Sequence, residues 1–168
     1  MKNTFFRSFL LSLFYIFINC LISNAELIIP FDLWPKIENK ISNITILVAE
    51  TEKLSHQGFC GASSKQFQTT AIWFPEIEQA TVFVNTNPGY GTVNQNIQVV
   101  FLDKNWIVLD IITMEKKVGT AVAPDRTSSA LEGTPEVVKK LGFKKSRPAP
   151  FRIQKIGTRY FCQKMESK

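Results

Sequence analysis

Three adjacent amide side chains, Asn94, Gln95 and Asn96, are the strongest candidates for binding chemistry in this 168-residue chain. Amide groups offer both hydrogen-bond donors and acceptors, which suits a neutral polar ligand such as a sugar or a peptide group. The three residues belong to an asparagine-rich stretch between two apolar runs, 82–84 and 97–103, where plain turn chemistry is the competing interpretation. The stretch therefore predicts either a ligand-binding loop or an ordinary turn.

Three further polar residues would lie near these amides if the predicted sheet curls round into a barrel. Gln57 follows a short predicted turn, Glu132 belongs to a predicted strand, and Arg126 precedes that strand. In this hypothesis the amides hydrogen-bond the ligand, and Arg126 orients an acidic group on it. We therefore predict one binding site on the polar surface between residues 85 and 98, with the amides at 94–96 as ligand contacts and Gln57, Arg126 and Glu132 nearby.

Residues suited to catalysis are few. His56 can act as a general base near neutral pH, and Asp103 and Asp110 can act as an acid–base pair if their carboxyl groups lie about 5–9 Å apart. The alternatives are a solvent-facing histidine, an Asp103 that hydrogen-bonds its own turn, and an Asp110 that pairs with Arg126. The chain has no Gly-x-Ser-x-Gly, phosphate-binding or His-Glu-x-x-His motif. We therefore assign no catalytic residue, no metal ligand and no cofactor.

The first 25 residues have the pattern of a secretory signal peptide. Two basic residues precede an apolar run from 9 to 22, and the segment 23–25 places small residues three and one before a cleavage point. The apolar run is shorter than the ~20 residues that span a membrane. We therefore predict cleavage after Ala25 and a periplasmic or secreted protein. An uncleaved anchor and a lipid attached to Cys20 are the alternatives.

Charge is distributed unevenly over the rest of the chain. Residues 26–143 carry 10 basic and 13 acidic side chains, a net −3, whereas residues 144–168 carry eight basic and one acidic, a net +7. A basic tail of this kind can contact anionic lipid, wall polymer or a partner protein, or it can be a frayed, solvated terminus. Export argues against a role in binding nucleic acid.

Cys60 and Cys162 are the two cysteines that follow the predicted leader. In an oxidising compartment they can form a disulfide, which would close a loop of about 100 residues and tie the basic tail to the body of the domain. Two separate thiols are the alternative, because sequence does not reveal the distance between them.

Short strands dominate the expected structure. Runs rich in β-branched and aromatic residues predict strands at 44–50, 69–74, 80–86, 97–103, 106–114, 127–133 and 151–156. Lys104-Asn105 would form a two-residue turn in the central hairpin. We expect an irregular lead-in at 26–43, one domain at 44–143, and a basic C-terminal extension at 144–168.

Helix signals are stronger than strand signals but rarer. Thr134 as the N-cap, Pro135 at the first helical position and Gly142 after the last turn predict a helix between them. Thr51 and Gly58 mark the ends of a short helical turn. Many strands with one or two short helices predict an α+β fold, mainly antiparallel, with a partly closed barrel-like sheet.

The order of these elements resembles the domain of unknown function 192 family, a group of small exported or membrane-anchored bacterial and archaeal proteins. Four stretches within residues 44–143 carry the resemblance: ITILVAETEKLSHQGFC, AIWF, NQNIQVVFLDKNWIVLDI and ALEGTPEVVKKLGF. In the family's pattern a methionine stands where this chain has Cys60, and an aspartate stands where it has Gln98. The resemblance implies a compact, mainly β domain outside the cytoplasm and no established activity.

These patterns predict an exported domain that acts as a binding or accessory module of the cell envelope. Its partner would be a neutral polar ligand, a sugar or peptide, or another envelope protein, and membrane contact would come only through the leader or the basic tail. One alternative is a hydrolytic enzyme acting on envelope polymer through His56 or the two aspartates. The other is a structural protein that docks by its basic tail.

Overall fold

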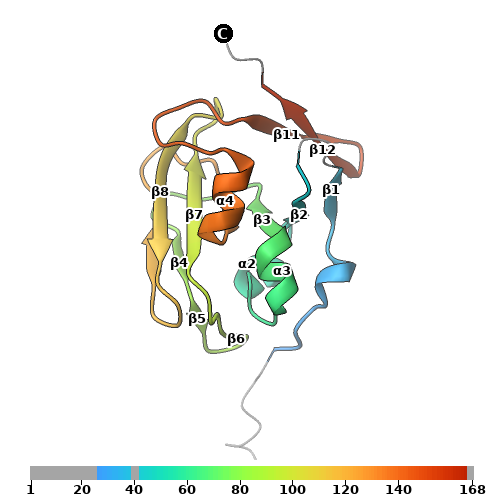
Figure 1. The fold of residues 1–168 in the computed structure, drawn as a ribbon, viewed down its shortest axis with the longest axis vertical. Helices are drawn as coiled ribbons and strands as arrows, with labels where there is room; N and C mark the ends of the chain where they lie inside the picture. The colour runs from blue at the N-terminus through green and yellow to red at the C-terminus, as the bar shows by residue number, and fades with distance from the viewer. Residues whose placement is uncertain (1–25, 39–41, 166–168) are drawn as a thin grey trace, which may run out of the picture.

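The fold is built on one mixed sheet of eight strands, in a computed structural model that describes residues 26–38 and 42–165 (Figure 1). The strands lie in the order β11-β12-β1-β2-β3-β10-β7-β8. Their bounds are β1 Lys36–Glu38, β2 Thr45–Val48, β3 Thr70–Phe74, β7 Ile97–Leu102, β8 Val108–Met114, β10 Ser129–Gly133, β11 Phe151–Ile156 and β12 Arg159–Lys164. Most neighbours run antiparallel, whereas β1–β12 and β2–β3 run parallel.

Two small ribbons and four short helical segments complete the described part of the chain. The ribbons pair β4 Val82–Val84 with β9 Thr120–Val122, and β5 Thr86–Asn87 with β6 Gly91–Thr92. The helical segments are the 3-10 turn η1 Phe31–Leu33 and the α-helices α2 Glu52–Gln57, α3 Ser64–Thr69 and α4 Pro135–Leu141. The α+β fold class is therefore confirmed. The barrel-like closure is wrong, because β11 and β8 are open edges of the sheet.

The two faces of the sheet carry separate hydrophobic clusters. Side chains alternate between the faces along each strand, so Leu131 on β10 points to one face and its neighbour Glu132 to the other. On the Leu131 face, Val137 and Leu141 of α4 are buried against the sheet. The opposite face packs against α2, η1 and the β4–β9 ribbon through residues that include Leu54, Phe59, Phe31, Phe74 and Phe83. Glu132 thus faces the second cluster.

Helix α4 begins and ends where its sequence signals predict. The side chain of Thr134 accepts a hydrogen bond from Val137 N, Pro135 occupies the first turn, and Gly142 has the left-handed conformation at φ 83°. Thr51 and Gly58 likewise bound α2. Because both helices are short, the caps satisfy a large share of their unpaired backbone groups.

Replacing Thr134 by alanine should lower the free energy of unfolding by about 1–2 kcal/mol. The hydroxyl caps α4 and also donates to the Phe67 carbonyl oxygen at 3.1 Å, which would lose that partner. Urea denaturation measures the change. Thr134→Ser keeps the hydroxyl and is the control; an equal loss in both variants would mean that the methyl group, and not the hydrogen bonds, is responsible.

The basic tail is part of the sheet and not an appendage. Residues 151–164 form the β11–β12 hairpin, in which Phe151, Ile153 and Tyr160 are buried, and β12 pairs with β1. The sheet therefore extends beyond the expected domain limits of 44–143 at both ends. The expected strand at 151–156 coincides with β11.

Three local predictions need correction. Ser63 and Gln66 form a capping box that starts α3, in a stretch expected to be loop. The expected irregular lead-in contains β1. The central hairpin turns at Lys104-Asn105 as predicted, where the Trp106 N–H donates to the Asp103 carbonyl oxygen at 3.0 Å, but Trp106 at φ 62° adds a third residue to the expected two-residue loop. The expected leader at 1–25 lies outside the described residues. Within the described residues, no helix has both the length and the apolar character to cross a membrane.

Candidate functional site

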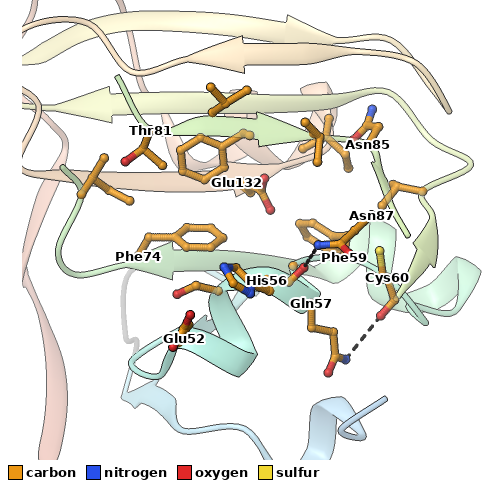
Figure 2. Close-up of a pocket in the computed structure, with 18 of the residues that line it drawn as sticks. Glu52, His56, Gln57, Phe59, Cys60, Phe74, Thr81, Asn85, Asn87 and Glu132 are labelled. Atoms are coloured by element: carbon orange, nitrogen blue, oxygen red, sulfur yellow. Dashed lines mark hydrogen bonds between the residues drawn. The ribbon is translucent and has the colours of Figure 1, made fainter. Parts of the chain in front are cut away.

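A cavity of about 560 Å³ opens on the sheet face that packs against α2 (Figure 2). Its walls come from α2 and the segment after it, the end of β3 and the loop that follows, β4, parts of the stretch 85–97, and Glu132 near the end of β10. This volume lies within the range of pockets that hold small organic ligands.

Glu132 is the one charged residue on the sheet wall of the cavity among the described residues. It lies on β10 between β3 and β7, with Ile72 and Val99 as its register partners. Its side chain is 5% exposed, and Figure 2 shows its carboxyl group pointing into the cavity, towards α2. No described residue hydrogen-bonds this carboxyl group. Gly58 approaches it so closely that a Cβ there would lie 3.4 Å from Glu132 Oε2.

Burial sets the charge of Glu132. Because the ionised carboxylate loses water in this apolar setting, its pKa rises from 4.5 to about 8. The group is therefore mostly protonated at neutral pH in the empty cavity. It can donate one hydrogen bond, or release its proton when a compensating positive charge arrives.

Aromatic side chains line the cavity that the carboxyl group faces. Phe59, Phe74 and Phe83 all line the cavity and are all buried. The rings of Phe74 and Phe83 meet edge to face, with centroids 5.1 Å apart, and Phe59 stacks on Phe67 at 5.4 Å. These contacts fix the rings in place, so the apolar part of the cavity is preformed.

The mouth of the cavity is acidic. Glu52 on α2 and the exposed pair Glu76 and Glu78 after β3 line it, together with His56. No lysine or arginine occurs among the described residues that line the cavity. In a low-dielectric cleft such a distribution concentrates negative potential.

Cys60 lines the cavity but lacks the character of a nucleophile. Its thiol donates to the Gly91 carbonyl oxygen at 3.5 Å. Burial, together with the nearby Glu132 carboxylate, raises the pKa of the thiol to about 11. The thiol is therefore protonated at physiological pH, and the thiolate form that reacts is scarce.

The predicted disulfide between Cys60 and Cys162 is absent from the structure, where both are free thiols. Cys60 belongs to the hydrophobic cluster on the cavity side of the sheet. Cys162 on β12 packs against the cluster on the α4 side. The two thiols are therefore separated by the layer of the sheet itself.

Gln57 lines the cavity, but its amide group is already committed. Its Oε1 accepts from Ile29 N at 2.8 Å, and its Nε2 donates to the carbonyl oxygens of Ile29 at 2.9 Å and Cys60 at 3.3 Å. The residue is 1% exposed. Its amide group therefore ties residues 26–34 to α2, leaving little hydrogen-bonding capacity for a ligand.

The prediction that residues 94–96 share one surface with Gln57 is wrong. Asn94, Gln95 and Asn96 are exposed and line a different, shallow surface depression, where Asn96 Oδ1 accepts from Lys116 N. Arg126 is exposed in a turn at φ 69°. Of the six predicted site residues, the cavity brings together only Gln57 and Glu132.

Both candidate aspartates already have local partners. Asp103 accepts from the backbone N–H groups of Asn105 and Ile107, both at 2.8 Å, as a turn aspartate does. Asp110 pairs with Lys145 at 2.8 Å and not with Arg126, because the segment after α4 hydrogen-bonds alongside β8. The hydrogen bond from Lys145 lowers the pKa of Asp110.

Two asparagines of the predicted 85–98 surface, not named among its ligand contacts, line the cavity and hold its walls together. Asn85 is 1% exposed and donates to the carbonyl oxygens of Met114 and Glu115 at 3.3 and 2.7 Å. Asn87 donates to the His56 carbonyl oxygen at 3.1 Å, which links β5 to α2. The asparagine-rich stretch is thus partly structural.

Comparisons with known proteins find two solved structures of low similarity. No protein-family model and no curated protein matches the chain. A solved protein of unknown function from Novosphingobium aromaticivorans is 14% identical, covers 73% of this chain and 97% of its own, and has a TM-score of 0.49. A putative transcription regulator from Sinorhizobium meliloti is 15% identical, covers 62% and 79%, and has a TM-score of 0.43. The resemblance to family 192 stays a prediction.

Proposed function

We propose that this protein is a ligand-binding module that holds a small molecule in the cavity, in contact with Glu132. The observation that carries the proposal is a buried carboxyl group that no described residue hydrogen-bonds and that faces an open cavity. Burying a carboxyl group without a protein partner is not favoured by stability alone. A bound ligand supplies the missing partner, and perturbed acids in clefts are common at functional sites.

We further propose that the module acts in the cell envelope. The support is the signal-peptide pattern of residues 1–25. The buried thiols neither strengthen nor weaken this proposal, because two free cysteines are compatible with either side of the membrane.

The hydrolytic alternative has less support than the binding function. Asp103 and Asp110 each have local partners and do not line the cavity. The lining residues that could do acid–base work are His56, Glu132 and the acidic residues at the mouth. The Cys60 thiol is protonated, so it is not an activated nucleophile. Ligand binding requires only a cavity, an apolar lining and a polar group to orient the ligand, and the cavity around Glu132 has all three.

A thermal-shift screen of sugars, peptides, amines and carboxylates tests the binding function on the purified protein. A true ligand should raise the melting temperature of the wild type by several degrees at saturating concentration. It should give little or no shift with Glu132→Gln, which keeps the shape of the side chain but has no acidic proton and cannot ionise.

The control is Glu136→Gln, which removes a carboxylate four residues away, exposed at the start of α4 and outside the cavity. Its shifts should match those of the wild type. Hits that survive Glu132→Gln but disappear when Asn94, Gln95 and Asn96 are changed to alanine would move the site to the surface depression and contradict the proposal.

A further inference from the structure

The cavity around Glu132 is chemically one-sided, and this carries an inference about its ligand. Besides Glu132, its described titratable lining residues are Glu52 and His56 on α2, Cys60 after α2, and Glu76 and Glu78 after β3. Four of these six groups are carboxyl groups, and the lining contains no lysine or arginine. An anionic ligand would meet repulsion at the mouth and no fixed cation inside, so the electrostatics exclude that class.

The apolar part of the lining also favours a positively charged ligand over an anionic one. Phe59, Phe74 and Phe83 line the same cavity as Glu132, and the contact between the rings of Phe74 and Phe83 is preformed. Figure 2 shows Phe59 and Phe74 on the side of the cavity that Glu132 faces. Aromatic faces attract cations, most strongly where the pair is shielded from water. A carboxylate next to aromatic rings is therefore a favourable setting for an ammonium group that carries a small apolar body.

We infer that the ligand is a small organic cation, an amine or quaternary ammonium compound whose charged nitrogen lies against Glu132 and whose apolar part packs on Phe59, Phe74 and Phe83. The inference rests on the proposed binding function and adds the chemical class. The cavity volume of about 560 Å³ limits the ligand to a small molecule.

Binding of the cation is coupled to loss of a proton. With a pKa of about 8 in the empty cavity, Glu132 is mostly protonated at pH 7 and must ionise to pair with the cation. Affinity therefore rises about tenfold for each pH unit up to about pH 8 and then levels off. About one proton leaves the protein for each cation that binds at pH 7.

A neutral ligand that accepts a hydrogen bond is the alternative occupant. Protonated Glu132 can donate to a carbonyl oxygen, and that interaction weakens as pH rises through about 8. The three carboxylates at the mouth add nothing to the binding of such a ligand, whereas they attract a cation. The opposite pH dependences separate the two classes.

Calorimetric titration of the full-length purified protein tests the inference. The probes are tetramethylammonium, choline and benzyltrimethylammonium, with 3,3-dimethylbutan-1-ol as the uncharged isostere of choline. Quaternary ammonium groups keep their charge at every pH, so any pH dependence belongs to the protein. Titrations from pH 6 to pH 9 in two buffers of different ionisation enthalpy report the affinity and the number of protons released.

We expect at least one quaternary cation to bind more tightly than the isostere, with the stated rise in affinity between pH 6 and pH 8. Glu132→Gln should weaken that binding at pH 8.5 by about 30-fold or more and remove the rise. Glu136→Gln should behave as the wild type. His56→Asn isolates any contribution of the histidine that lines the cavity.

The outcomes separate the two proposals. If the isostere binds as tightly as choline, or affinity falls as pH rises, the ligand is not a cation but the cavity still binds. If no cation binds at about 10 mM while the thermal-shift screen yields ligands that need Glu132, the cation inference is wrong and the binding function stands. If the screen also yields none, both are wrong.

Discussion

Replacing Glu132 by glutamine should stabilise the protein by about 3–5 kcal/mol at pH 9 and leave its stability nearly unchanged at pH 4.5. The folded-state pKa of this buried carboxyl group is about 8, above its ordinary value of 4.5. Between these two values the folded protein keeps a proton that the unfolded chain has released. The contribution of Glu132 to wild-type stability is therefore most favourable below about pH 4.5 and is lost as pH rises towards 8.

Denaturant titrations of the wild type and Glu132→Gln at pH 5, 7 and 9 measure this effect. The wild-type free energy of unfolding should fall by about 1.4 kcal/mol per pH unit across the window, and the variant should lack that slope. Glu136→Gln should keep it. The low pKa of Asp110 acts in the opposite direction and at lower pH, so it does not interfere. An unchanged slope in Glu132→Gln would mean that Glu132 ionises as an ordinary surface carboxyl group.

Replacing Gln57 by alanine should destabilise the protein by about 3–4 kcal/mol. The change removes three hydrogen bonds at once and leaves the backbone N–H and carbonyl oxygen of Ile29 and the carbonyl oxygen of Cys60 without these partners. It also removes the side-chain link between residues 26–34 and α2. That segment makes other contacts, including a hydrogen bond from the Tyr90 hydroxyl to the Glu26 carboxylate, so it should loosen before the sheet unfolds.

Denaturation midpoints measure the loss of stability, and hydrogen exchange locates it. Backbone amides of residues 27–34 should exchange much faster in Gln57→Ala than in the wild type. Exchange of the β7 and β10 amides should speed up only as far as the loss of global stability requires. Gln68→Ala changes an exposed glutamine on α3 and should cost less than about 0.5 kcal/mol. Equal effects of the two substitutions would show that the contacts of Gln57 with Ile29 are weak.

Local signals predicted the elements whose stability is local. Thr134, Pro135 and Gly142 define α4 through contacts within one helix, so sequence alone located it. The same logic was available for α3, because Ser63 and Gln66 form a capping box. The glycine and serines of that stretch favoured loop, and a six-residue helix has too little apolar periodicity to outweigh them.

The site depended on strand order, which local patterns do not encode. Glu132 was among the predicted site residues, and its position in a fully buried strand between Leu131 and Gly133 was a usable signal. Its partners in the cavity come from residues far away in sequence, because β10 inserts between β3 and β7. The amides at 94–96 looked similar in sequence but lie beside the start of α4.

Parallel pairing of β1 with β12 joins the first and last strands of the described chain. Ile37 lies beside Tyr160 and Glu38 beside Phe161, with both strands running in the same direction. Tension applied between the two ends of the chain would pull these strands lengthwise past each other. All the hydrogen bonds between them would then have to yield together, whereas a hairpin opens one bond at a time. The response of this pairing to extension is governed by the rate of unfolding under load and not by equilibrium stability.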